Sequence, residues 1–376
     1  MSLPFKENAY PLTLGVELEL QVLDQQTLLL TPRAKEIVSA AKNSKLTPEM
    51  FQSTLEVVSG VCRDVHEVDR DLTTSMEEIL AVSNTLGLTL SSTGTHPLAD
   101  YRDRLITDKE RYHQLIDRNQ WLIRRMAVYG MHIHLGMKSG DDCIRFGNFF
   151  LHFAPHLIAL SASSPFWQKM DTGLMASRPT LYESLPTAGM PYLVKDWREF
   201  ERLITFLKRS KSIESLKDLW WDVRPSPAIG TVEIRICDEP ATRKEILGIV
   251  AFVHALAFWF EENQNFWVKQ TAPIKRWILR ENKWRAIRYG LDASVIVSRT
   301  GSTSSIRADL QEWLKRLRPY IDALGYNDYV TNLFSIIEKG NSAQRQRAIM
   351  EKNQDGQAVV KHNMQEFLNG TPNWYI

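Results

Sequence analysis

The segment Gly15-Val16-Glu17-Leu18-Glu19-Leu20 decides the fold, because its side chains alternate between apolar and acidic. A period of two residues is typical of a β-strand, with the apolar side chains on one face and Glu17 and Glu19 on the other. Two glutamates spaced in this way lie about 7 Å apart, and they repel each other by roughly 2 kcal/mol at an effective dielectric of about 20. A solvated sheet face tolerates such a pair easily, so this segment alone predicts a strand and leaves the role of its acids open.

Three further segments repeat this pattern of polar side chains on an otherwise apolar strand. They are residues 53–58, with Glu56; residues 130–137, with His132 and His134; and residues 231–238, with Glu233 and Arg235. A solvated face more often carries Lys, Thr, Ser and Gln, whereas these faces carry carboxylates, imidazoles and a guanidinium. If the four strands share one sheet, their polar faces meet in one site.

The segments between these strands have the apolar spacing of helices. Helices are predicted over residues 33–42, 65–86, 141–161 and 241–265. The strands are too far apart for simple βαβ units, which favours an α+β fold with a mixed or antiparallel sheet over a doubly wound one. Length alone would suggest roughly two or three domains. Because the strands must share one sheet, we instead predict a single catalytic domain over residues 1–376, with residues 241–376 mostly helical.

The acids and histidines of the predicted strands suit a metal site. Carboxylates with an occasional imidazole are ligands for hard cations such as Mg²⁺ or Mn²⁺. Zinc competes, because His132 and His134 have a spacing that zinc accepts, but zinc sites are usually four-coordinate with nitrogen and sulfur ligands. The two histidines could equally be satisfied core residues. Glu233 and Arg235 form either a plain salt bridge or a metal ligand beside a phosphate clamp, since arginine binds phosphate through two hydrogen bonds.

Further basic residues lie in two segments that are rich in turn formers and are predicted to be loops. Arg178 lies in residues 177–180 and Arg224 in residues 221–227. Either arginine could hold a substrate carboxylate or phosphate, although arginines in loops are commonly just solvated. Residues 275–288 interleave basic and apolar side chains, which indicates a basic amphipathic helix with a face turned to solvent or to a nucleotide.

Composition and missing motifs exclude several classes of protein. The net charge of +2 is too balanced for a nucleic-acid binder with a concentrated basic face. Three widely spaced cysteines fit neither a disulfide framework nor a cysteine zinc site, so we expect a reducing cytoplasm. The apolar run of residues 246–260 is shorter than the ~20 residues of a membrane span, and residues 1–11 lack the apolar core of a secretory signal. The sequence contains no P-loop, no Rossmann fingerprint and no G-x-S-x-G elbow.

Eight segments occur in an order that resembles one enzyme family. They are Gly15–Leu20, Leu55-Glu56 with Val61-Cys62-Arg63-Asp64, Gly94-Thr95-His96-Pro97, Gly130–Gly136, Ser177-Arg178-Pro179, residues 221–227, Gly230–Arg235 and Arg288-Tyr289-Gly290-Leu291. Each is weak alone, but together they resemble the bacterial carboxylate–amine ligases, also called glutamate–cysteine ligase type 2, from about Leu12 to Leu291. Their Glu-x-Glu, Gly-Met-His-x-His and Glu-x-Arg patterns are similar to those of the glutamine synthetase superfamily.

This resemblance implies a fold, a reaction and a set of site residues. The fold is a curved, largely antiparallel sheet whose concave face is the active site, packed by helices. The reaction uses ATP and Mg²⁺ (or Mn²⁺) to activate a carboxylate as an acyl phosphate, which an amine then attacks. By position, the resemblance implies metal ligands at Glu17, Glu19, Glu49, Glu56, His132 and Glu233, phosphate-side catalytic groups at His134 and Arg235, a substrate-carboxylate anchor at Arg178 and a nucleotide contact at Arg288. Gln52 stands where family members can carry an acid, which puts the geometry beside the metals in doubt.

Three functions stay open at this level. The first is an ATP- and Mg²⁺-dependent carboxylate–amine ligase, with the γ-carboxyl of glutamate as the expected donor and cysteine or another amine as the acceptor. The second is a metal-dependent phosphotransferase of the guanidino-kinase type, and the third is a non-catalytic metal-binding protein. As partners we expect small-molecule carboxylate and amine substrates, no nucleic acid and no membrane, and, from the resemblance alone, a homodimer.

Overall fold

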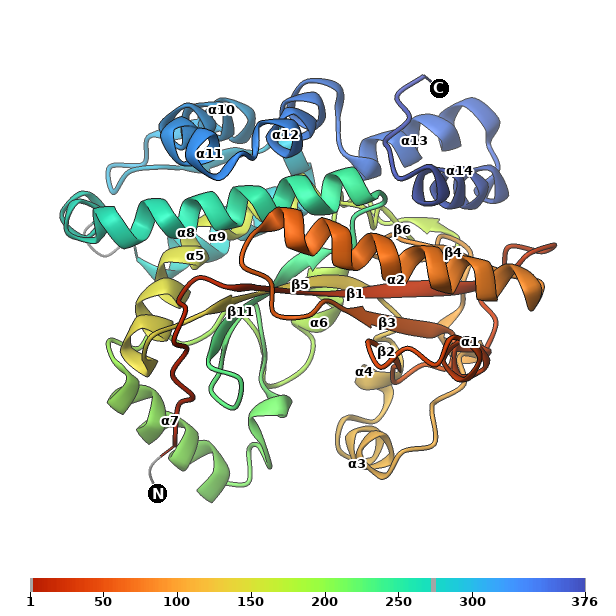
Figure 1. Cartoon of the computed structure of the whole chain (residues 1–376), viewed down its shortest axis with the longest axis horizontal. Coiled ribbons are helices and arrows are strands. Elements are labelled where there is room, and N and C mark those ends of the chain that lie inside the picture. Colours follow the sequence, from red (N-terminus) through yellow and green to blue (C-terminus); the bar gives the residue numbers. More distant parts are fainter. Residues whose placement is uncertain (1–2, 272–274, 376) are drawn as a thin grey trace.

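A seven-stranded sheet lies at the centre of the protein, whose computed structural model describes residues 3–271 and 275–375 (Figure 1). Strand β1 (Leu14–Asp24) pairs with β3 (Thr54–Val58), β4 (Leu88–Ser91) and β5 (Gly130–Gly136). Strand β5 pairs with β11 (Thr231–Asp238), β11 with β10 (Val223–Ser226), and β3 with β2 (Leu46–Pro48). All these pairs are antiparallel, which confirms the predicted fold class.

The register of the sheet brings the predicted polar residues side by side. Glu19 stands opposite Glu56, and Glu17 stands opposite His132. On the other side of β5, His134 stands opposite Glu233. The polar faces of the four predicted strands therefore do meet, and the apolar residues of β1 point to the opposite face, where Leu18 and Leu20 are completely buried.

Three long helices cover this apolar face. They are α2 (Val65–Thr85), α5 (Gly140–Ser161) and α8 (Arg243–Thr271). Figure 1 shows α2 and α8 lying over the sheet, with the C-terminal helices stacked beyond them. The apolar run of residues 246–260 belongs to α8 and is almost wholly buried, as expected of a core helix. Within the described ranges, no helix has both the length and the apolar character that a membrane crossing requires.

The remaining elements frame the polar face or complete the helical layers. The helices are α1 (Ala34–Ala41), α3 (Glu110–Asn119), α4 (Trp121–Arg124), α6 (Arg178–Tyr182), α7 (Trp197–Arg209), α9 (Arg276–Tyr289), α10 (Ile306–Arg316), α11 (Arg318–Leu324), α12 (Asn327–Lys339), α13 (Ser342–Asn353) and α14 (Gly356–Asn369). Short two-stranded pairings join β6 (Phe166–Trp167) to β7 (Met170–Asp171), β8 (Ala188–Gly189) to β9 (Trp220–Trp221), and β12 (Ser294–Ile296) to β13 (Thr303–Ser305). Most of the described residues after Arg243 lie in helices.

Two of the predicted loops are wrong. Residues 221–227 contain β10, where Pro225 pairs with Val232. A proline is compatible with β10 because this strand forms the edge of the sheet, so one side needs no backbone N–H. Residues 177–180 run into α6, which carries a proline in its first turn, where the missing N–H costs nothing.

Candidate active site

The polar face of the sheet forms one wall of a cavity of about 410 Å³, which we call the acid cavity. Its lining includes Glu17, Glu19, Glu49, Glu56, His132, Arg224 and Arg235 from the sheet side, and Tyr112, Leu115, Ile123 and Met126 from α3 and the residues around α4. A larger but shallower hollow of about 880 Å³ runs along α7, lined by residues of that helix and Ser210. It contains one acid and no histidine, so the acid cavity is the place where the predicted chemistry is concentrated.

Glu17 lies between the two histidines of β5. Its Oε2 is 3.0 Å from Nδ1 of His132, and its Oε1 is 3.0 Å from Nε2 of His134. Burial acts to raise the pKa of Glu17, but the two histidine contacts outweigh it and hold this pKa well below its usual range. Burial and the nearby Arg235 lower the pKa of His132 to about 4. Glu17 is therefore a fixed, ionised carboxylate beside a neutral His132.

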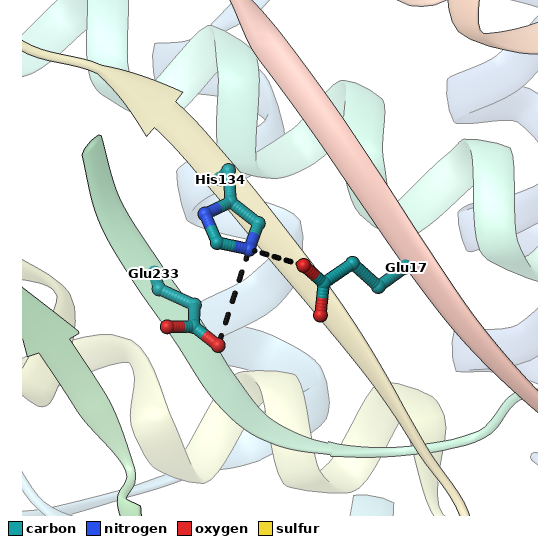
Figure 2. A group of neighbouring side chains, drawn as sticks. All are labelled: Glu17, His134 and Glu233. Atoms are coloured by element: carbon teal, nitrogen blue, oxygen red, sulfur yellow. Dashed lines mark hydrogen bonds and ion pairs between the residues drawn. The ribbon is translucent and has the colours of Figure 1, made fainter. Parts of the chain in front are cut away.

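A second buried acid, Glu233, is held by two arginines. Nε and Nη2 of Arg224 lie 3.0 and 2.6 Å from one oxygen of Glu233, and Nη1 of Arg235 contacts the other oxygen. Burial acts to raise the pKa of Glu233, but these two guanidiniums lower it far below normal. Figure 2 shows Glu17, His134 and Glu233 converging from three strands, with ligand atoms all within 4.8 Å of one another.

The other end of the acid cavity holds three carboxylates close together. Glu19 and Glu56 are cross-strand neighbours, and Glu49 lies just beyond β2. Burial, followed by the charges of Glu49, Glu17 and Glu19, raises the pKa of Glu56 to about 9. Burial raises the pKa of Glu19 to about 7, although Arg178 acts against it. Carboxylates that repel each other in this way are stabilised by a cation placed between them.

The donor set of the acid cavity fits a divalent cation. Acids predominate, as Mg²⁺ and Mn²⁺ prefer. His132 lines the cavity, and its buried Nε2 has no hydrogen-bond partner among the described residues. Arg224 and Arg235 already neutralise Glu233. The carboxylates of Glu19, Glu49 and Glu56 are therefore more available to a cation than that of Glu233. His134, assigned to the phosphate side by the resemblance, instead lies with Glu17 and Glu233 in a group whose possible metal-ligand atoms are all within 4.8 Å of one another.

Two arginines from the predicted site do not line the acid cavity. Arg178 is 3% exposed and donates to the carbonyls of Arg235 and Cys237, so it is buried against the backbone of β11. Arg288, near the end of α9, contacts the carbonyl of Gly173 and its Cζ lies 5.0 Å from the centre of the Tyr289 ring. Neither arginine is among the described residues that line the acid cavity.

Several cavity residues were not predicted from the sequence as parts of the site. Tyr112 donates to Glu49, and Tyr182 and Trp220 also line the cavity. Arg111 and Lys217 are exposed cations at its rim. No local pattern marks these residues, because each comes from a segment that reaches the site only through the tertiary fold. Gln52, the departure from the family pattern, binds the backbone of residues 105 and 106 and does not belong to the described cavity lining.

Comparisons with known proteins agree along nearly the whole chain. The sequence matches the model of the glutamate–cysteine ligase family 2 (GCS2) over residues 13–362. A Bdellovibrio bacteriovorus protein named "Putative glutamate–cysteine ligase 2" is 41% identical over 350 residues, which cover 93% of this chain and 92% of the relative. A Gloeobacter violaceus protein of the same name is 39% identical over 368 residues, which cover 96% of this chain and 98% of the relative.

Two solved structures share the fold at low sequence identity. A glutamate–cysteine ligase from Francisella tularensis in complex with AMP has a TM-score of 0.68 at 12% identity, covering 97% of this chain and 90% of that chain. A bifunctional glutathione synthetase from Pasteurella multocida has a TM-score of 0.65 at 15% identity, covering 96% of this chain and 52% of that chain.

Proposed function

The chain belongs to the glutamate–cysteine ligase family 2 and is an ATP-dependent carbon–nitrogen ligase, and from this premise we propose that it joins the γ-carboxyl of glutamate to an amine through an acyl phosphate, with Mg²⁺ as its cofactor. The names of the relatives make cysteine the first acceptor to test. Other small amines are included in the proposal, because the side chains of the acid cavity single out no thiol.

The observation that carries this proposal is the placement of an acid cluster and Arg235 on one wall of the same cavity. A carboxylate is a poor acyl donor until one of its oxygens carries phosphate, and that transfer depends on positioning and on neutralising the phosphoryl charge. When bound, Mg²⁺ supplies part of that neutralisation. The guanidinium of Arg235 supplies another part, because arginine matches the geometry of phosphate oxygens and stays charged.

The acids of the cavity are already oriented for this task. Glu17 is fixed by the two histidines, and Glu19 accepts a hydrogen bond of 2.6 Å from the backbone N–H of Gly130. Glu49 accepts from the N–H of Met50 at 2.7 Å and from the Tyr112 hydroxyl at 3.3 Å. Groups held in place before the substrate arrives lose little entropy on binding it, which is how such sites reach high rates.

A screen for ADP release tests the proposal. The purified protein is incubated with ATP, Mg²⁺ and glutamate against a panel of amines that begins with cysteine, and mass spectrometry follows the product. We expect ADP release to require both glutamate and an amine, together with an amide of the corresponding mass. A stable phosphorylated product would instead establish the phosphotransferase alternative. A folded protein without ATP turnover for any donor would establish the non-catalytic alternative.

The cellular location and the oligomeric state complete the proposal. We propose a cytoplasmic location, supported by three cysteines that are all unpaired and buried. A homodimer follows from the resemblance alone, and light scattering of the purified protein tests it.

A further inference from the structure

Strand β11 carries a bulge at the position of Arg235. Between Ile234 and Cys237 this strand advances by three residues, whereas the paired segment of β5, from Ile133 to Met131, advances by two. One residue of β11 is therefore extra at this point. Bulges of this kind interrupt the hydrogen-bond ladder and change the direction of a side chain, and they are frequent beside active sites.

The backbone of the bulge is held from two sides. On one side, the N–H of Arg235 donates to the carbonyl of Asp222 at 2.8 Å. On the other side, Nη1 of Arg178 donates to the carbonyl of Arg235 at 3.2 Å and to that of Cys237 at 2.9 Å. The Arg178 side chain thus binds the carbonyls at both ends of the irregular stretch, where the regular ladder is broken.

The space around Arg178 is shaped for its guanidinium. The Cζ atom of Arg178 lies 4.8 Å from the centre of the Tyr182 ring. Gly130, the first residue of β5, leaves room on another side, because a methyl group at this glycine would overlap the guanidinium. A buried cation with this many fixed neighbours has little freedom to turn toward a ligand.

The alternative role, an anchor for a substrate carboxylate, requires donors that face the substrate. Arg178 borders a void of about 20 Å³, shared with Arg235 and Tyr182. Such a void has room for about one water and not for an amino acid. In addition, Nη1 of Arg178 already donates to the two backbone carbonyls.

We propose that Arg178 is a positioning residue: it holds the bulge of β11 so that the guanidinium of Arg235 points into the acid cavity. This inference rests on the proposed function, in which Arg235 meets the transferred phosphoryl group. It replaces the role of substrate anchor that the resemblance implied for Arg178.

Steady-state kinetics of Arg178→Lys test the proposal. Lysine keeps the buried positive charge but cannot bind both carbonyls in the same geometry. We expect kcat to fall by about 100-fold, as a misplacement of about 1 Å can cause, while KM for glutamate changes less than about twofold. The double variant R178K/R235Q should be no slower than R235Q, because Arg178 acts through Arg235. A KM raised tenfold at unchanged kcat, or effects that multiply in the double variant, would overturn the proposal.

The matched control is Arg104→Lys. Arg104 also donates to two backbone carbonyls, of Asp100 and Leu30 at 3.1 Å each, but it lies outside the described lining of the acid cavity. We expect its kcat to equal that of the wild type. Thermal unfolding of each variant is measured first, so that a loss of rate is read only for folded protein.

A second measurement does not depend on activity. In protein labelled with ¹⁵N-arginine, the Nε–H signal of Arg235 is identified by its disappearance in R235Q. We expect this signal to shift in R178K and to stay in place in R104K. An unmoved signal in folded R178K would contradict the positioning role. If the wild type releases no ADP with any donor and amine, the proposed function fails, while this signal still decides whether Arg178 positions Arg235.

Discussion

Arg224 donates hydrogen bonds to a single oxygen of Glu233 from two nitrogens, Nε at 3.0 Å and Nη2 at 2.6 Å. The other oxygen of Glu233 contacts Arg235, and Glu233 is 1% exposed. Glu233→Ala would therefore leave two largely buried guanidiniums without their shared anion. We expect the free energy of unfolding to fall by about 3–5 kcal/mol in this variant, measured by urea denaturation.

Glu36→Ala is the control for this prediction. Glu36 also accepts from two nitrogens of one arginine, with Nε and Nη2 of Arg33 at 2.8 and 2.7 Å from its two oxygens, but this pair lies at the exposed start of α1. We expect a loss below about 1 kcal/mol there. Equal losses in the two variants would show that burial of the Glu233 pair contributes nothing. For activity measurements, Glu233→Gln is the better variant, because its amide oxygen still accepts hydrogen bonds from the arginines.

Glu56→Gln should stabilise the protein in the absence of metal. The pKa of Glu56 is about 9 in the folded chain, because of burial and the neighbouring acids, and about 4.3 in the unfolded chain. Protonation of Glu56 therefore favours the folded state: this contribution to the free energy of unfolding is complete below about pH 4 and is lost as pH rises toward 9. In EDTA at pH 8 we expect Tm to rise by about 2–4 °C in the variant, with a smaller gain at pH 5.

Mg²⁺ provides the second half of this test. Calorimetry with and without Mg²⁺ should show a rise in Tm for the wild type and a smaller rise for Glu56→Gln, since the variant has lost one cation ligand. Glu312→Gln, on the exposed face of α10, serves as the control and should respond to Mg²⁺ like the wild type. A Mg²⁺ response of Glu56→Gln equal to that of the wild type would remove Glu56 from the metal site.

Glu17→Ala and Arg235→Ala should separate metal binding from phosphoryl transfer. Glu17→Ala should lose Mg²⁺-dependent ATP turnover, because it removes the carboxylate between His132 and His134. Arg235→Ala should keep Mg²⁺ binding, measured by titration calorimetry, but lose about 10²–10³-fold in kcat, as for other groups that stabilise transition-state charge. Turnover of Glu17→Ala at the wild-type level would make the metal assignment wrong.

The alternation of polar and apolar residues was sufficient to predict four strands and the meeting of their polar faces. It succeeded because a period of two assigns each side chain to a face independently of the rest of the fold. The same rule missed β10, since Pro225 reads as a turn former and only the edge position makes it acceptable. It also could not reveal the bulge at Arg235, which a regular period does not encode.

Residues that act through distant contacts lay beyond sequence reasoning. Arg178 contacts carbonyls 57 and 59 positions away, so its burial against the backbone of β11 follows only from the tertiary fold. Position within the family motif implied an anchor, because sequence position does not tell whether the nitrogens of an arginine face a cavity or bind backbone carbonyls. Tyr112 of α3 reaches Glu49 across 63 positions for the same reason.

His254 makes a testable contribution to the pH dependence of stability. It is completely buried in α8, with Nε2 at 2.8 Å from the carbonyl of Leu12 and Nδ1 at 2.7 Å from the hydroxyl of Tyr326. Burial lowers its pKa to about 4, against about 6.5 in the unfolded chain. Between these values the unfolded chain binds the proton and the native protein does not, so stability falls as pH drops from about 6.5 to 4, by up to about 3 kcal/mol. In His254→Gln, the free energy of unfolding measured with urea should change less with pH over this interval than in the wild type. His113→Gln, at the surface, is the control and should follow the wild type. If His254→Gln and the wild type have identical slopes, His254 contributes nothing to this pH dependence.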